Sequence, residues 1–275
     1  MACKGARKRQ VPPEIQAADI RLAEEEQPET TEVESKAAVE RLLFGVDSRT
    51  PADTLLKNNI TAFEWAVRNK RYPNFWGRNV AGEQALTKSE IDFLHSKGCK
   101  VAAIYPDSGE KRTEGQGQAL AEKIKETAVK LEIPQGTAIF LEISEEETAT
   151  RDFMRGVAGG LLQSGFVPGF RANTDARYSF DYEYSRGMQT DRDLFSRCLI
   201  WAVAPGLKEY DRVTTTHLIH PDNWIPFAPS AIKRNDIAVW QYGKNCHPID
   251  DDAGNETTFN VDLVKNDRVI MEKMF

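Results

Sequence analysis

The segment TAIFLEISEEE, residues 137–147, carries a carboxylate in a position where it could do chemistry. The aliphatic residues Ile139, Leu141 and Ile143 alternate with Phe140, Glu142 and Ser144. A period of two is typical of a β-strand with two different faces. The aliphatic face suits a layer of helices, so we expect Glu142 and Ser144 to point into the interior of a barrel. A carboxylate there needs a partner or a chemical purpose, because an unpaired buried charge is costly.

Two interpretations of this carboxylate remain open. Glu142 forms a salt bridge with an interior arginine such as Arg78, or it takes part in acid–base chemistry. Asp47, at the end of the segment LLFGVDS, is ambiguous in another way. It caps the helix expected after it, or it lines a pocket.

The elements that must position these residues follow from short apolar runs, most of which precede a helical pattern. We expect strands over residues 42–48, 74–80, 99–109, 137–144, 166–173, 198–205 and 237–243, and helices over 51–67, 87–98, 115–136 and 149–165. Alternating strands and helices predict an α/β domain with a parallel sheet and right-handed crossovers. Seven or eight strands match a (β/α)8 TIM-like barrel, with degenerate late repeats between residues 206 and 236. An open doubly wound sheet is the alternative, but the turn VDSRTPADT lacks the glycine pattern of dinucleotide binding.

Residues 1–38 differ in composition from the rest of the chain. A basic opening is followed by the acidic segment AEEEQPETTEVESK, which has almost no large apolar side chains. We therefore expect a flexible tail or linker at 1–38, open to a tethering or targeting role, and a barrel over 39–275. The basic start is not followed by the apolar segment of a standard secretory signal. We therefore expect the protein in the cytoplasm, or outside the cell after export by a non-standard route.

Composition excludes several classes of protein. With 275 residues, a net charge of −6 and a pI near 5.4, the chain lacks the basic surface of a general nucleic-acid or membrane-surface binder. No apolar run is long enough to span a bilayer. The cysteines Cys3, Cys99, Cys198 and Cys246 lack metal-ligand spacing, which favours free thiols over a disulfide. The pair in HLIH, residues 217–220, is a weak zinc signature, so neither metal nor cofactor is expected.

Polar and aromatic residues at strand ends are the candidates for ligand contact, because chemistry in a parallel barrel sits where the strands end. They are Asp47, Arg78, Tyr105, Asp107, Glu142, Ser144, Asn173, Trp201, Trp240, Gln241 and Tyr242. The aromatic rings could stack on the apolar faces of sugars, and the alternative for each ring is a place in the core.

Several segments occur in one order that is informative as a set. They are FGVDS, GQALAEKIKETAVKLEIPQGTAIFLEI, GFVPGFRAN and VWQYG followed by FNVDLVKND. This order resembles a bacterial glycoside-hydrolase-like domain of unknown function, which is itself similar to the barrel-type muramidases of the Chalaropsis lysozyme kind, the family-25 glycoside hydrolases. The resemblance covers residues 42–268 and implies a (β/α)8-like barrel with a carbohydrate-facing pocket.

The resemblance also implies site residues. Asp47 matches the aspartate of the first strand in the muramidases, Glu142 matches the first acid of an acid-x-Glu pair on their fourth strand, and Asp262 matches the aspartate after WQY. Ser144 stands where the proton-donating glutamate belongs, and serine has no proton to give near neutral pH. The glutamates at 145–147 form a solvated acidic turn or supply an alternative donor, with the turn as the favoured interpretation, and Asp107 is a further alternative donor.

Three functions follow as hypotheses. The first is a hydrolase of a bacterial glycan such as peptidoglycan, with Glu142 as acid and Asp47 or Asp262 as nucleophile or stabilising group. The second is a glycan-binding barrel without turnover. The third is an interaction protein whose N-terminal tail engages a protein partner.

Overall fold

The computed structural model describes residues 42–57, 59–68, 72–106, 111–146, 148–209, 221–246, 257–265 and 268–275. The described strands are β1 (Leu42–Asp47), β2 (Phe75–Asn79), β3 (Lys100–Pro106), β4 (Ala138–Glu142), β5 (Val167–Ala172), β6 (Leu199–Ala202), β7 (Lys208–Glu209), β8 (Val239–Cys246) and β9 (Phe259–Lys265). The described helices are α1 (Ala62–Arg68), α2 (Lys88–Ser96), α3 (Glu114–Lys130), α4 (Arg151–Gln163), α5 (Ser179–Thr190), α6 (Arg192–Phe195) and α7 (Arg268–Glu272), with a 3-10 turn at Arg234–Asp236. The predicted tail, its boundary at residues 38/39, Asp107 and the HLIH pair lie outside the described residues.

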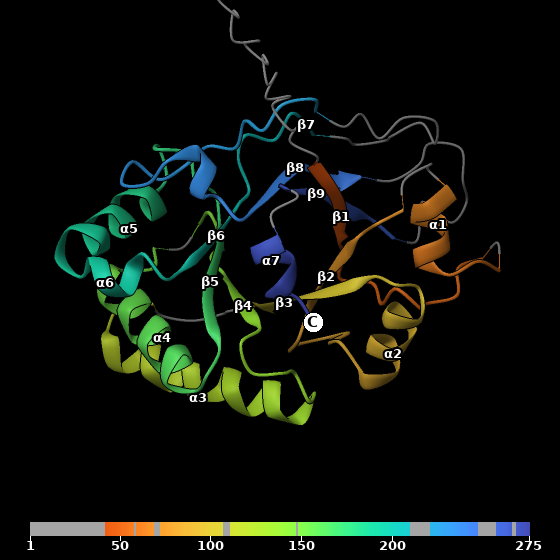
Figure 1. Cartoon of the computed structure of the whole chain (residues 1–275), viewed down its shortest axis with the longest axis horizontal. Coiled ribbons are helices and arrows are strands. Elements are labelled where there is room, and N and C mark those ends of the chain that lie inside the picture. Colours follow the sequence, from red (N-terminus) through yellow and green to blue (C-terminus); the bar gives the residue numbers. More distant parts are fainter. Residues whose placement is uncertain are drawn as a thin grey trace, which may run out of the picture. The chain divides into compact units, whose positions relative to one another are not determined.

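Eight of these strands close into a barrel. They follow the order β6-β5-β4-β3-β2-β1-β9-β8, and β8 pairs with β6 to complete the ring, while the two-residue β7 adds to β8. Figure 1 shows helices α1 to α6 around the outside of the strands and α7 over the middle of the ring. The predicted TIM-like barrel is therefore confirmed, and the described part of 206–236 holds only β7 and one 3-10 turn, as expected for degenerate late repeats.

Two expectations about the elements are wrong. The prediction of an all-parallel sheet fails at β9, which runs antiparallel to both β1 and β8. The helix expected over 51–67 begins only at Ala62, and Thr61 starts it by exchanging hydrogen bonds with Glu64. The residues before it form turns closed by a bridge between Leu55 and Thr61, with Asn59 at a φ of 57°.

The apolar side chains form two cores separated by the sheet. The larger core lies between the strands and the outer helices and includes Ile139, Leu141 and Ile143. The smaller core fills the barrel and includes Phe140 and Trp201. The expected division of the two faces of β4 is therefore confirmed.

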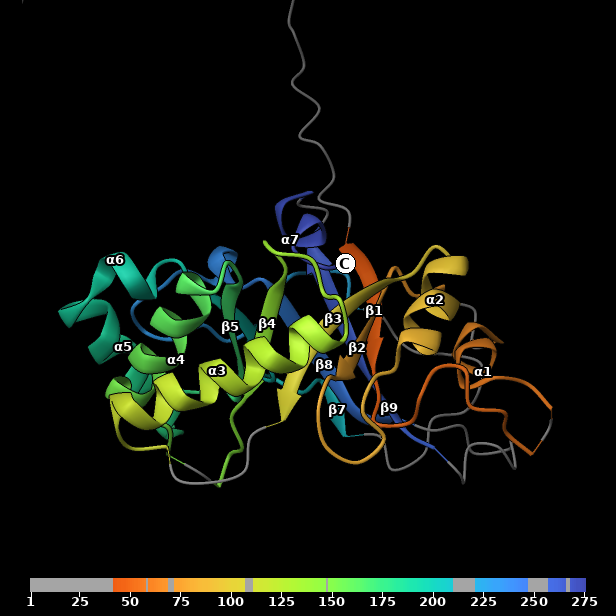
Figure 2. The same cartoon turned by 90° about the horizontal axis from the view of Figure 1, so that it is seen from below.

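The C-terminal segment covers the end of the barrel where the parallel strands begin (Figure 2). Phe275 exchanges backbone hydrogen bonds with Val101 of β3, and Ala138 of β4 donates to the carbonyl of Lys273 at 2.8 Å. Ile270 and Met274 pack into the smaller core. The C-terminal segment therefore closes the centre of the barrel at this end.

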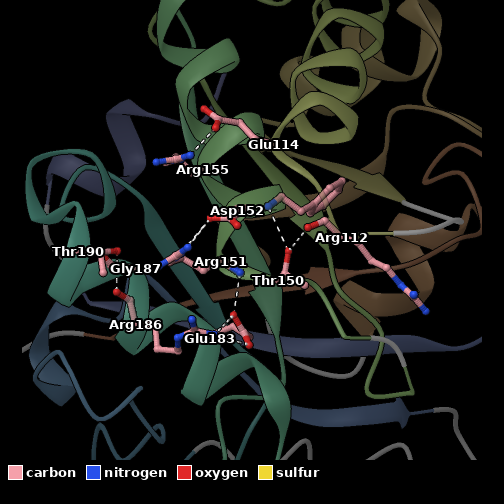
Figure 3. A network of polar contacts seen from close by, with 11 residues as sticks. Arg112, Glu114, Thr150, Arg151, Asp152, Arg155, Glu183, Arg186, Gly187 and Thr190 are labelled. Atoms are coloured by element: carbon pink, nitrogen blue, oxygen red, sulfur yellow. Dashed lines mark hydrogen bonds and ion pairs between the residues drawn. The ribbon is translucent and has the colours of Figure 1, made fainter.

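Helices α3 and α4 pack closely outside β3, β4 and β5. Polar contacts connect them and reach α5: Arg155 pairs with Glu114, and the backbone N–H of Arg151 donates to Glu183 at 2.9 Å (Figure 3). Two glycines allow the helices to approach, because a Cβ on Gly117 would lie 2.2 Å from the carbonyl oxygen of Phe153, and one on Gly156 would lie 2.1 Å from that of Glu114.

We expect Gly156→Ala to lower the free energy of unfolding by about 1–3 kcal/mol, because the added methyl group forces the two helices apart. Urea denaturation measures this change. Gly159→Ala is the matched control on the same helix, since its Cβ would meet nothing within 4 Å. The control is expected to be neutral or to stabilise by up to about 1 kcal/mol, and equal losses in both variants would contradict the close-approach argument.

Candidate functional site

A cavity of about 640 Å³ opens where the parallel strands end. Its floor carries Asp47 from the end of β1, Glu142 from the end of β4 and Arg171 from β5. The remaining lining is mostly polar and includes Asn79, Ser144, Asn173, Gln241, Lys244 and Asn260. The site therefore lies at the strand ends, as the sequence predicts for a parallel barrel.

Arg171 joins the carboxylates on the cavity floor. Its guanidinium pairs with Glu142 and, at 3.3 Å, with Asp47, and it also donates to the side-chain oxygen of Gln241. The register of β4 and β5 places Glu142 directly beside Arg171. The predicted salt bridge of Glu142 therefore exists, but Arg171 is its partner and Arg78 is not.

Asp47 and Asp262 form a second carboxyl contact beneath this floor. Asp262 is fully buried, and its Oδ1 accepts a hydrogen bond from Trp201 Nε1 at 2.9 Å. Its Oδ2 is buried with no basic donor among the described residues and interacts with the carboxyl group of Asp47. Asn260 donates a hydrogen bond to Asp47 at 2.8 Å. Asp47 therefore accepts hydrogen bonds from Asn260 and Arg171 and also faces the carboxyl group of Asp262.

Charges in the barrel shift the pKa values of Asp262 and Arg171 in a consistent way. Burial, followed by the neighbouring Asp47, raises the pKa of Asp262 well above its ordinary value, against the opposing effect of Arg171. Burial alone would lower the pKa of Arg171, but Asp47, Glu142 and Asp262 raise it. The surroundings of Asp262 therefore favour its protonated form, and the three carboxyl groups favour the cationic form of Arg171.

We expect Asp262→Asn to flatten the dependence of stability on pH. An acid whose pKa is higher in the folded state binds more protons there, so its contribution to stability is present at low pH. That contribution is lost as pH rises from the unfolded pKa, near 4, toward the folded pKa, with a slope of at most about 1.4 kcal/mol per pH unit. Urea denaturation from pH 4 to pH 8 measures the slope. Asp236→Asn is the exposed control, and parallel curves for wild type and Asp262→Asn would contradict the assignment.

The structure separates the predicted site residues into two groups. Asp47, Glu142, Ser144, Asn173 and Gln241 line the cavity. Asp47 caps no helix, because α1 begins at Ala62. The pocket interpretation of Asp47 is therefore the one that its position favours.

The second group does not line the cavity. Trp201 and Asp262 are buried below the floor, where the ring of Trp201 lies 5.5 Å from the guanidinium carbon of Arg171. Trp240, Tyr242 and the half-buried Tyr105 belong to the core between the sheet and the helices. Trp240 and Tyr242 flank Gln241, so a strand that turns Gln241 inward turns both rings outward. Their predicted role in stacking on a sugar in this cavity is therefore wrong, and the core alternative holds.

Arg78 supports the rim of the cavity from outside the barrel. It is completely buried and forms an ion pair with Glu90 of α2 at 2.7 Å. Its guanidinium also donates to the backbone carbonyls of Ser48, Arg49 and Gln84. Burial raises the pKa of Glu90 and Arg78 opposes that rise. Since Ser48 and Arg49 line the cavity, Arg78 positions the rim of the cavity without lining the cavity itself.

Sequence reasoning missed Arg171, Asn79 and Asn260. A signal for Arg171 was available, because Arg171 and Asn173 are two residues apart and a strand places both on one face. Among the described residues, no cluster of three or more His, Cys, Asp or Glu side chains could hold a metal ion. In the same residues no helix is long and apolar enough to cross a membrane.

The closed barrel and the carboxylates at its strand ends define a glycoside-hydrolase-like domain. Residues 69–265 match the Rv2525c-like, glycoside hydrolase-like domain, and the chain belongs to that family. The family resemblance that the sequence segments indicate by their order along the chain is thereby confirmed. No curated protein matches the chain.

Solved structures resemble the chain to different degrees. An uncharacterized protein of B. stearothermophilus is 24% identical, with a TM-score of 0.67 over 85% of this chain and 100% of that chain. The modular autolysin LytC from Streptococcus pneumoniae, solved with a synthetic peptidoglycan ligand, is 10% identical, with a TM-score of 0.49 over 81% of this chain and 46% of its own. GHIP, a glycosyl hydrolase 25 of the same organism, is 11% identical, with a TM-score of 0.48 over 85% of this chain and 92% of its own.

Proposed function

We propose that the chain binds a bacterial glycan, with peptidoglycan as the expected example, in the cavity at the strand ends. The observation that carries this proposal is the cluster on the floor, where Arg171 holds Asp47, Glu142 and Gln241 in fixed positions. Carboxylates and amides accept and donate hydrogen bonds to sugar hydroxyls, and side chains fixed by ion pairs lose little entropy when a ligand binds. Membership of a glycoside-hydrolase-like family supports a sugar as the ligand.

Binding without rapid cleavage fits this cluster better than a conventional glycosidase does. Cleavage needs a group that protonates the leaving oxygen and a second group that stabilises or attacks the sugar carbon. Glu142 and Asp47 both accept hydrogen bonds from Arg171, and Ser144 stands two residues beyond Glu142. Both floor carboxylates therefore act as hydrogen-bond acceptors toward Arg171, which opposes the predicted role of Glu142 as the acid.

One observation favours slow hydrolysis as a second candidate function. Burial and the neighbouring Asp47 raise the pKa of Asp262 and so favour a protonated carboxyl group next to Asp47, which lines the cavity. Passing that proton through Asp47 to the glycosidic oxygen would break the bond between that oxygen and the sugar carbon, while a water adds to the carbon and gives its proton to Glu142. On this account Asp47, Glu142 and Asp262 remain the catalytic group, with Asp262 as the source of the proton. The scaffold hypothesis depends on the N-terminal tail and stays a prediction.

Calorimetric titration with a soluble oligosaccharide of N-acetylglucosamine and N-acetylmuramic acid tests binding. We expect Glu142→Gln and Gln241→Ala to weaken binding at least tenfold, a loss of about 1.4 kcal/mol each. Glu122→Gln is the matched control, since it removes a carboxylate from an exposed pair with Lys125 on α3. Absence of binding by wild type, or equal weakening by the control, would refute the proposal.

Release of reducing ends from purified peptidoglycan separates binding from hydrolysis. Hydrolysis predicts release by wild type, and a rate at least tenfold lower for Glu142→Gln and for Asp262→Asn. Intact binding with no release between pH 4 and pH 8 would reject the enzyme and leave the binding protein.

A further inference from the structure

A second cavity, of about 780 Å³, lies at the opposite end of the barrel from the candidate site. Val167 and Leu199, the first residues of β5 and β6, line it. Lys265, the last residue of the antiparallel β9, lines it too. The two cavities have no lining residue in common, so the second is not an extension of the first.

Cationic side chains converge on this second cavity although the chain is acidic overall. Arg192, Arg197, Lys233 and Lys273 line it, and none of them forms an ion pair with a described residue. Asp236 is the only carboxylate among the described lining residues, and it accepts a hydrogen bond from the backbone N–H of Lys233 at 2.9 Å. Lys265 is held by Asn235 at 3.0 Å. Among the described lining residues, cationic side chains therefore outnumber carboxylates.

The floor of the second cavity is apolar. Tyr184, Ile237 and Ile270 are buried beneath it, and Met188 is 8% exposed. Pockets of a few hundred cubic ångströms that combine an apolar floor with a few convergent polar groups are typical of small-molecule sites. A cationic rim adds a preference for anions, since arginine and lysine bind phosphate and carboxylate oxygens with charge-assisted hydrogen bonds.

We propose that this second cavity binds a small anionic amphiphile, a molecule with a phosphate or carboxylate head and an apolar body of several carbon atoms. The head contacts Arg197 and Lys233 at the rim, and the body covers Ile237 and Ile270. Binding relieves the mutual repulsion of the cations and removes apolar surface from water. This site is independent of glycan binding, because it lies at the other end of the barrel.

Octyl phosphate, below its micelle concentration, is the probe, and calorimetry is the measurement. We expect it to bind at least tenfold more tightly than inorganic phosphate or octanol, since only the amphiphile uses both the rim and the floor. Its affinity is expected to fall with rising salt, because the rim cations are screened. Equal affinity for octyl phosphate and for octanol would overturn the anionic preference.

Substitutions locate the site. Arg197→Gln combined with Lys233→Gln is expected to weaken octyl phosphate at least tenfold and to leave oligosaccharide binding unchanged. The matched control is Lys123→Gln combined with Lys130→Gln, which removes the same charge from exposed positions of α3. Equal weakening in both double variants would reject the cavity. Binding to phosphatidylglycerol vesicles without binding to octyl phosphate would also overturn the proposal, in favour of a membrane surface as the partner.

Discussion

Arg171→Met is expected to lower the free energy of unfolding by about 3–5 kcal/mol near neutral pH. Arg171 has only 8% of its side chain exposed and is the cation that balances Asp47 and Glu142. Without it, Asp47 and Glu142 lose the cation that pairs with them, and Gln241 loses its donor. Methionine preserves much of the side-chain length, so the loss reports charge more than volume.

The dependence on pH distinguishes this cause from a packing defect. Protonation removes the uncompensated negative charge, so the difference between Arg171→Met and wild type is expected to shrink as pH falls from 7 to 4. Arg177→Met is the control, since Arg177 is 82% exposed in its pair with Asp175, and exposed pairs contribute about 0–1 kcal/mol. A difference that is constant with pH would mean that Arg171 acts through packing alone.

Arg78→Met is expected to cost a similar amount, about 3–5 kcal/mol, and to weaken ligand binding without touching the ligand. The substitution leaves Glu90 buried without its cation and frees three backbone carbonyls. Two of those carbonyls belong to Ser48 and Arg49, which line the candidate site. Denaturation measures the first effect, and oligosaccharide titration measures the second.

Arg78→Lys separates the two roles of this arginine. Lysine keeps the charge beside Glu90, but its ammonium group cannot reproduce the planar set of donors. We expect Arg78→Lys to recover part of the stability and little of the binding. Full recovery of binding would show that the three carbonyls do not fix the rim.

The sequence predicted the barrel and part of its floor because both depend on local periodicity. Alternation along β4 is enough to place Glu142 inward, and the end of β1 is enough to bring Asp47 to the same edge. The prediction that Trp240, Gln241 and Tyr242 all contact a ligand conflicts with the alternation of a strand, which allows either Gln241 or its two neighbours to face inward. The position of Gln241 depends on the register between β8 and its neighbours, which the sequence does not carry.

Other features depend on contacts between distant segments. The antiparallel direction of β9 has no signature in its own residues, since a buried strand reads the same in either direction. The connection from β8 to β9, residues 247–258, is also long enough for a crossover to a parallel strand, which takes about a dozen residues or more, so its length does not distinguish the two directions. The raised pKa of Asp262 follows from its burial beside Asp47. In the β1–β9 ladder Asp262 lies opposite Gly45, and Asp47 is two residues further along β1 on the same face. Only the assembled ladder shows that proximity.

The reversed direction of β9 gives the candidate site a boundary that can vary in length. Lys244 and Asn245 of β8 line the cavity, and so do Thr258, Phe259 and Asn260 around the start of β9. The connection between these strands therefore leaves and returns at the same mouth. Doubling the length of a flexible connection costs only about 0.6 kcal/mol, and no outer helix has to be rebuilt. A change in the length of this connection would therefore alter the rim of the cavity while Arg171 and its carboxylates stay in place.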